Sequence, residues 1–367
     1  MSDLVELARR LVAVESINPG LDAAGSGEGA VARVIAEWCE RAGLEVSVEE
    51  AAPGRPNVVA TARGGGRGGG RTLLLNGHVD TVGVAGMADP FSGRVDGDRL
   101  YGRGSHDMKG AVAACLVACE RASRLDLRGD VVVTAVADEE VASVGTTAVA
   151  ASQRGDAAIV AEPTDEKLGI AHRGFAGFHI RVAGRAAHGS RPDLGIDAIA
   201  NTGPVLTRIT ELDSRLRAGQ AHPLLGTGSM HASLISGGQE YSSYPAFCDL
   251  HGERRTIPGE TDADVAREVA ALVGEVDASW GLTVTRGPFE IDEGHEIVDL
   301  VARHAGVPER VGLPFWTDAA LLHAAGIPTV LFGPCGEGLH TEIEWVSLVS
   351  LERCVETYVA VAAELCA

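Results

Sequence analysis

Apolar and polar positions follow one pattern in the first half of the chain. Continuous apolar runs at 73–75 and 131–136 predict strands buried on both faces, and the apolar run 111–122 predicts a helix between them. A further strand is predicted at 157–161, and polar residues stand where these strands end. Strands that alternate with helices in this way predict an α/β domain with a central, mostly parallel sheet flanked by helices.

The pattern changes after about residue 173. Residues 175–183 alternate between apolar and polar, as expected of a strand with one exposed face. Helices are then predicted at 196–216 and 261–274, with strands at 230–235 and 247–256 between them. This order suits a small α+β, ferredoxin-like module with a one-sided sheet.

From about residue 290 the first pattern resumes, with a final helix predicted at 347–364. The sequence therefore predicts one α/β domain interrupted by an inserted α+β domain. The expected boundaries are 1–173 and 290–367 for the two parts of the first domain and 174–289 for the insertion.

Composition narrows the class of protein. A chain of 367 residues with 45% hydrophobic and 22% charged residues is typical of a folded protein with two domains. The net charge of −20 argues against nucleic-acid binding, because a phosphate backbone would be repelled. Neither a membrane span nor a signal peptide is predicted. Seven scattered cysteines without a Cys-x-x-Cys pair indicate free thiols in a reducing compartment, so we expect a cytoplasmic protein.

The strand at 73–75 ends in Asn76-Gly77 and is followed by His78 and Asp80. If the strand continues, these two side chains project to the same side, because side chains alternate along a strand. Functional sites in open α/β sheets usually lie at this end of the strands. A strand end closed by a simple His–Asp hydrogen bond explains the pair equally well.

Candidate metal ligands recur at strand ends and in loops of the α/β domain. Imidazole and carboxylate ligands suit zinc, cobalt or manganese, and a pair of such ions needs one carboxylate to bridge them. Taken singly, an Asp can cap a helix, a Glu-Glu pair can be a solvated turn, and a Glu before Pro can simply end a strand. The coincidence of all five at such places favours a metal site. The five are His78, Asp107, Glu140, Glu162 and His340.

Six motifs, in order along the chain, resemble the di-zinc metallopeptidase family of acetylornithine deacetylase, succinyl-diaminopimelate desuccinylase, aminoacylase and glutamate carboxypeptidase. They span nearly the whole chain. The motifs are Gly-His-Val-Asp (77–80), Gly-Arg-Gly-Ser-His-Asp-Met-Lys-Gly (102–110), Asp-Glu-Glu (138–140), Glu-Pro-Thr (162–164), Gly-Arg-Ala-Ala-His (184–188) and Gly-Leu-His-Thr (338–341).

The resemblance implies a role for each candidate in a site with two zinc ions. Asp107 would bridge the ions, with His78 and Glu162 completing one site and Glu140 and His340 the other. Glu139 would be the general base that moves the proton of the attacking water. Asp80 would hold the imidazole of His78 in place.

Two residues of the inserted domain match by resemblance as well. His188 would stabilise the oxyanion in the site of a partner subunit, which makes the insertion a dimerisation domain. Arg255 would bind the carboxylate of the substrate through its planar guanidinium. A surface histidine and a strand-edge arginine are the alternatives. Two positions depart from the family pattern. Ser242 stands where many members carry Asn, which leaves the set of substrates open. Ile343 follows the last ligand, where a more polar residue is common.

The implied function is metal-dependent hydrolysis of the amide bond of an N-acyl amino acid. Glu162, in place of Asp, favours the deacetylase and desuccinylase branch by analogy. A dipeptidase or carboxypeptidase acting on short peptides is the alternative within the family. A homologue that binds its ligand without turnover is a third interpretation, and the presence of all five ligands together with Glu139 argues against it.

Overall fold

The computed structural model describes residues 3–65, 69–84, 86–306 and 309–367. The chain folds into two compact units. The first comprises residues 1–170, 291–311 and 317–367, and the second comprises residues 171–290 and 312–316. No helix in the described ranges combines the length and the apolar character that crossing a membrane requires.

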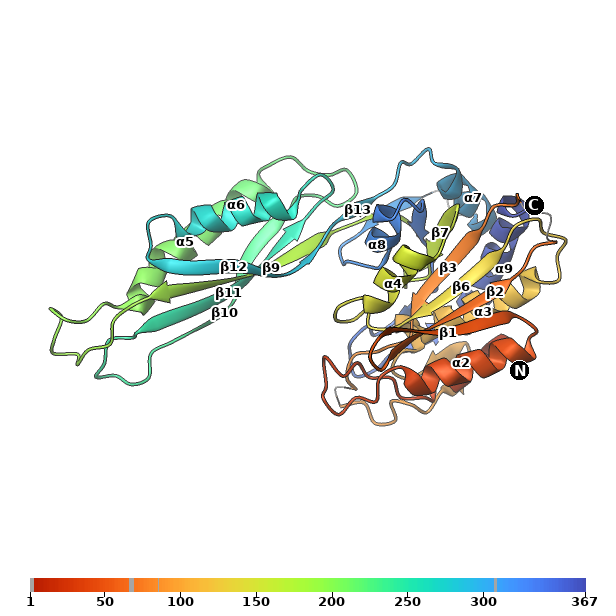
Figure 1. Ribbon diagram of the computed structural model, residues 1–367, viewed down its shortest axis with the longest axis horizontal. Helices are drawn as coiled ribbons and strands as arrows, with labels where there is room; N and C mark the ends of the chain where they lie inside the picture. Colours follow the sequence, from red (N-terminus) through yellow and green to blue (C-terminus); the bar gives the residue numbers. More distant parts are fainter. Residues whose placement is uncertain (1–2, 66–68, 85, 307–308) are drawn as a thin grey trace. The chain divides into compact units, whose positions relative to one another are not determined.

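Most strands of a large mixed sheet belong to the first unit and form its framework (Figure 1). Its inner strands β6, β3, β7 and β15 are parallel, and antiparallel pairing is confined to the flanking strands. The predicted central parallel sheet is thus confirmed. In spatial order the strands are β1 (Glu45–Ala52), β2 (Arg55–Ala62), β6 (Val131–Val136), β3 (Leu73–His78), β7 (Ala157–Val160), β15 (Thr329–Leu331), β8 (Leu168–His172) and β13 (Phe289–Glu290), while β14 (Arg310–Leu313) pairs with β8.

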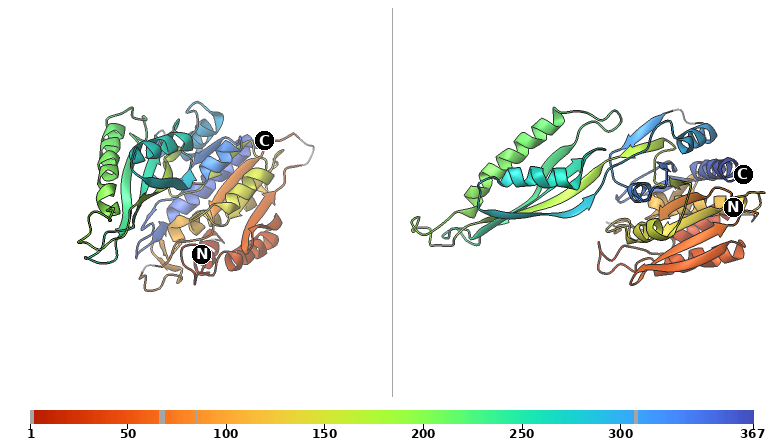
Figure 2. Two further views of the ribbon diagram at one scale, coloured as in Figure 1. Left: turned by 60° about the vertical axis from the view of Figure 1, so that its left-hand side comes forward. Right: turned by 45° about the horizontal axis from the view of Figure 1, so that its top comes forward.

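Helices flank this sheet, as the alternating pattern predicts. Helices α3 and α9 pack against each other, with α1 and α2 nearby, and α4 packs against α8 (Figures 1 and 2). All six residues of β3 are buried because the strand lies between two others and under helices. The helices are α1 (Asp3–Val12), α2 (Gly29–Arg41), α3 (Gly110–Ala122), α4 (Val144–Ser152), α7 (Glu296–Ala305), α8 (Ala319–Ala324) and α9 (Leu348–Leu365), with a short irregular helical segment η1 (Ser105–Lys109) before α3.

A small antiparallel sheet also belongs to the first unit, and the hydrophobic pattern does not predict it. Its strands are only two or three residues long, too short to show a periodicity. In spatial order they are β16 (Gly336–Glu337), β17 (Trp345–Ser347), β5 (Arg99–Tyr101) and β4 (Arg94–Asp96).

The second unit is a four-stranded antiparallel sheet with two helices on one face (Figure 2). Its chain order is strand–helix–strand–strand–helix–strand, as the sequence predicts. Helix α6 begins in a capping box, in which Thr261 and Asp264 satisfy each other's backbone N–H groups. The strands are β10 (Ser229–Gly237), β11 (Phe247–Thr256), β9 (Gly174–Ala183) and β12 (Ala278–Arg286), and the helices are α5 (Ala198–Arg217) and α6 (Asp262–Val273).

The seven cysteines all lie in described parts of the chain, and each is a free thiol. Burial raises the pKa of Cys39 to about 12 and that of Cys366 to about 11. These thiols are therefore core residues with little thiolate at neutral pH.

Candidate metal centre

Three neighbouring parallel strands bring four of the predicted site residues to one edge of the sheet. His78 is the last residue of β3 and pairs in register with Val136, the last residue of β6. Glu139 and Glu140 follow β6, and Glu162 follows β7. Because parallel strands end at the same edge, side chains from distant parts of the sequence meet there.

The imidazole of His78 is fixed by contacts at both nitrogens. Its Nδ1 lies 3.0 Å from the backbone carbonyl oxygen of Asp80 and 3.6 Å from Oδ1 of the Asp80 carboxylate. Its Nε2 lies 3.0 Å from Oδ1 of Asp107. A donor at Nδ1 leaves Nε2 free to act as a ligand, which is the arrangement that metal-binding histidines use.

The carboxylate of Asp107 faces two histidines. Its Oδ1 is the oxygen beside His78, and its Oδ2 lies 3.3 Å from Nε2 of His340. The same nitrogen of His340 lies 3.4 Å from Oε1 of Glu140. One carboxylate therefore has one oxygen beside His78 and the other beside His340, as a bridge between two ions would.

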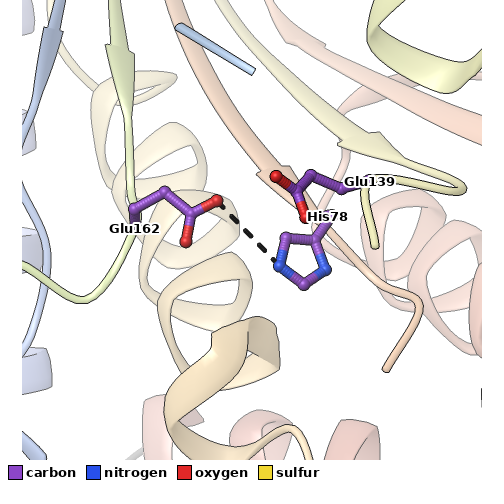
Figure 3. Close-up of side chains that lie close together, drawn as sticks. All are labelled: His78, Glu139 and Glu162. Carbon is purple, nitrogen blue, oxygen red and sulfur yellow. Dashed lines mark ion pairs between the residues drawn. The ribbon is translucent and has the colours of Figure 1, made fainter. Parts of the chain in front are cut away.

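Glu162 and Glu139 also lie close to His78. Figure 3 shows the two carboxylates around the imidazole, with Oε1 of Glu162 4.0 Å from Nε2 of His78. Two groups among the described residues have ligand atoms mutually within 4.8 Å, namely His78 with Glu139 and Glu162, and His78 with Asp107 and Glu140.

Burial and the concentration of negative charge shift the pKa values of these groups. Burial raises the pKa of Glu162 to about 8, and nearby carboxylates such as Asp107 add to the rise. Burial likewise raises the pKa of Glu139 well above its usual value. Hydrogen bonds to Asp107 and Glu140 raise the pKa of His340 to about 10. Burial thus favours the protonated forms of Glu162 and Glu139 in the metal-free protein, and a bound cation would favour their charged forms.

The residues present fit a pair of divalent ions. Ligand atoms about 2.1 Å from a tetrahedral ion lie about 3.4 Å from one another. The distances of 3.0 to 4.0 Å that join His78 and His340 to their carboxylate neighbours bracket this value. Imidazole nitrogens and carboxylate oxygens are also the ligands expected for zinc, cobalt or manganese.

Asp80 organises the segment that carries the two adjacent glutamates. Its Oδ1 accepts the backbone N–H of Glu139 at 3.1 Å, and its Oδ2 accepts the backbone N–H of Glu140 at 3.2 Å. Asn18 donates to Oδ2 at 2.7 Å and to Asp138 at 3.0 Å. Asn18 carries no signal of such a role in the sequence, because it stands far from every motif.

Asp318 is another buried carboxyl group near the cluster, and no pattern in the sequence marks it as a site residue. Its Oδ2 accepts a hydrogen bond from Thr146 at 2.6 Å, while its Oδ1 has no hydrogen-bond partner among the described residues. Burial raises the pKa of Asp318 to about 6. Asp318 stands at the N-cap position of α8, but its side chain makes no capping hydrogen bond.

The remaining predicted site residues belong to the second unit. His188 is exposed, and its Nδ1 lies 2.8 Å from Oγ of Ser190. Arg255, in β11, donates from Nε to Glu253 at 2.5 Å and lies over the ring of Phe175. The carbonyl oxygen of Ser242 accepts the N–H of Gly189. The functions of His188 and Arg255 remain predictions.

Comparison with known proteins gives a consistent result. The family model described as "Peptidase family M20/M25/M40" matches residues 74–364. Acetylornithine deacetylase of Proteus mirabilis is 29% identical over 365 residues, covering 95% of this chain and 93% of the relative. The same enzyme of Salmonella typhi is 30% identical, covering 90% and 89%. The solved structure of aminopeptidase PepT from Bacillus cereus has a TM-score of 0.81 at 20% identity, covering 99% and 98%. The chain therefore belongs to peptidase family M20/M25/M40, and it is a metal-dependent amide hydrolase.

Proposed function

We propose that this protein removes the acyl group from an N-acyl amino acid by hydrolysing its amide bond with two divalent metal ions. The observation that carries the proposal is the position of Asp107, whose two oxygens face His78 and His340. The curated relatives named acetylornithine deacetylase, similar over nearly their whole length, support the substrate class.

His78 and Glu162 would hold one ion, Glu140 and His340 the other, and Asp107 would contribute one oxygen to each. Zinc is the proposed metal, with cobalt or manganese as alternatives, since all three accept imidazole and carboxylate ligands. When bound, such ions lower the pKa of a water molecule and polarise the carbonyl of the amide.

Glu139 is the proposed general base and acid. Its carboxylate lies beside His78 and Glu162 (Figure 3), where it can take a proton from the attacking water. The water oxygen adds to the carbonyl carbon, and the carbon–nitrogen bond then breaks. Glu139 returns the proton to the departing nitrogen, so that the products are a carboxylic acid and a free amine.

Three further residues have supporting roles in the proposal. Asp80 holds the segment of Glu139 and Glu140 through their backbone amides. His188 would donate a hydrogen bond to the oxyanion in the site of the partner subunit. Arg255 would pair with the carboxylate of the amino acid, a ligand that suits its planar guanidinium.

A homodimer formed through the second unit is part of this proposal. Strand β10 is at the edge of its sheet and exposes Leu234 and Ile235, which are 68% and 53% accessible. An exposed apolar edge strand can pair with a second copy.

The free cysteines favour a reducing compartment, so we place the protein in the cytoplasm.

A panel of N-acetyl amino acids, N-succinyl amino acids and dipeptides, assayed with the purified protein, tests the substrate class. We expect about two metal equivalents per chain and the highest kcat/KM with an N-acyl amino acid. Chelation should abolish hydrolysis, and added zinc or cobalt should restore it. A preference for dipeptides would instead make the protein a peptidase, and turnover that survives complete removal of metal would refute the mechanism.

A further inference from the structure

A buried carboxylate outside the ligand set contacts the segment that carries Asp107. Glu344 lies four residues after His340 and is fully buried. Its Oε2 accepts hydrogen bonds from Nη1 of Arg103 at 2.6 Å and from the backbone N–H of Gly104 at 3.1 Å. Its Oε1 accepts the backbone N–H groups of His106 at 2.9 Å and of Asp107 at 3.1 Å.

The segment wraps around this carboxylate as a loop wraps around a bound anion. Successive backbone N–H groups that converge in this way form a concave anion site, here occupied by a side chain of the same protein. Gly104 makes the turn with a φ of +76°, and a Cβ at this position would lie 2.6 Å from Cε of Lys109. The backbone carbonyl of Glu344 also accepts the N–H of Gly102 at 3.1 Å.

Arg103 extends the contact to the segment of His340. Its side chain is buried and neutralises Glu344, and it also donates to the carbonyl oxygen of Thr341 at 2.9 Å. Thr341 directly follows His340. The network therefore reaches Asp107 through its backbone N–H and the second histidine through its neighbour. His78 is held separately, by the carbonyl of Asp80.

We propose that Glu344 is a positioning residue that fixes Asp107 as the bridge between the two metal sites, an inference that rests on the proposed two-metal function. Asp107 can serve both sites only while its two oxygens face His78 and His340 together. If the backbone of Asp107 shifts, one of its oxygens no longer lies beside its histidine. The network also holds the segment of His340, so loss of Glu344 should weaken binding of the ion at Glu140 and His340 (the second ion) much more than binding of the ion at His78 and Glu162 (the first ion).

The substitution Glu344→Gln tests the role while preserving size and shape. All four groups that contact the carboxylate are hydrogen-bond donors, and an amide replaces one acceptor oxygen by an NH2 group. One pair of donors then faces another donor, which leaves buried polar groups unpaired. Glu344→Asp is the second variant, because it keeps a charge for Arg103 but is one methylene too short to reach all four donors.

The measurement is a stepwise titration of the metal-free protein with cobalt, in which calorimetry gives the affinity of each ion and electron paramagnetic resonance detects a coupled pair. In the wild type we expect two equivalents and a magnetically coupled pair. In Glu344→Gln the affinity for the second ion should fall about 10- to 100-fold, as for other groups that orient ligands, with loss of the coupled signal. The first affinity should change much less, and Glu344→Asp should show a smaller change in the same direction.

Glu260→Gln is the matched control. Glu260 accepts hydrogen bonds from Nη2 of Arg254 at 2.6 Å and from the backbone N–H of Ile257 at 2.9 Å, but it belongs to the second unit. Its loss should lower thermal stability and leave both metal affinities unchanged. Two tightly bound, coupled ions in both Glu344 variants would overturn the inference, as would equal weakening of the two sites. Failure of the wild type to bind two ions would instead refute the proposed function.

Discussion

The carboxylate of Asp80 accepts a hydrogen bond from the backbone N–H of Glu139, with 3.1 Å between oxygen and nitrogen. Its other oxygen accepts the N–H of Glu140 at 3.2 Å, and its backbone carbonyl lies 3.0 Å from Nδ1 of His78. One residue thus orients the proposed base and two proposed ligands, the glutamates through its carboxylate and the histidine through its main chain.

Asp80→Asn should reduce metal affinity or activity about 10- to 100-fold. Both oxygens of Asp80 accept backbone N–H groups, and the amide would replace one of these acceptors by an NH2 donor. One buried N–H would lose its partner, which costs about 1–3 kcal/mol of stability. Metal competition and thermal unfolding measure the two effects. Asp22→Asn is the control, since Asp22 accepts the N–H of Ala24 at an exposed site. Wild-type metal affinity in Asp80→Asn would contradict the role.

Glu139→Gln should keep both metals and lower kcat about 10²- to 10⁴-fold, the usual contribution of a general base. The variant preserves shape and leaves the N–H that contacts Asp80 intact. Metal analysis and steady-state kinetics on the best substrate are the measurements. Glu356→Gln, an exposed position on α9, makes the same chemical change as a control. A Glu139 variant as fast as the wild type would exclude Glu139 as the base.

The framework of this fold is largely readable from the sequence, because long strands and helices impose a periodicity on it. The strands predicted at 131–136 and 247–256 have the same bounds in the structure. The small sheet of β16, β17, β5 and β4 is not predicted, because it depends on pairing between short segments that are far apart in the sequence.

The site divides in the same way. Residues that stand in motifs at strand ends, such as His78 and Glu162, can be selected from the sequence. Asn18, Asp318 and Glu344 cannot, because their contacts are with backbone groups or side chains from distant segments. A single buried Asn or Glu has no pattern that distinguishes it from a surface residue before the chain is folded.

The metal-free protein should become less stable as the pH rises from about 5 to about 9. The pKa of Glu162 is about 8 in the folded state against 4.5 ordinarily, and that of His340 is about 10 against 6.5. Both shifts are upward, so the folded state binds more protons than the unfolded state between pH 4.5 and 10, and stability falls with pH there. The pKa of Asp107 is lowered, so this residue changes the stability only at more acidic pH.

Thermal unfolding of the chelated protein across this range, beside the metal-loaded protein, measures the effect. Bound cations should raise the unfolding temperature most at the alkaline end, because they replace the protons that the cluster otherwise retains. The variant Glu162→Gln should flatten the profile of the metal-free protein. A metal-free protein whose stability rose steadily with pH would show that the cluster does not retain protons.

Mixed dimers test whether His188 acts in the site of the partner subunit. His188→Ala and Glu139→Gln should each be nearly inactive alone. If His188 acts across the dimer, a chain with Glu139 intact receives His188 from its Glu139→Gln partner, and one site of each mixed dimer works. Random exchange of equal amounts should then restore about a quarter of the wild-type activity per chain.

The control is a mixture in which Leu234→Lys is added to both variants to place a charge on the exposed edge strand β10. Sedimentation should show monomers, and the restored activity should disappear. Full wild-type activity in monomeric Leu234→Lys alone would refute both the dimer and the role of His188 in trans. Absence of any restored activity, with subunit exchange verified by mass, would place His188 in the site of its own chain or outside catalysis altogether.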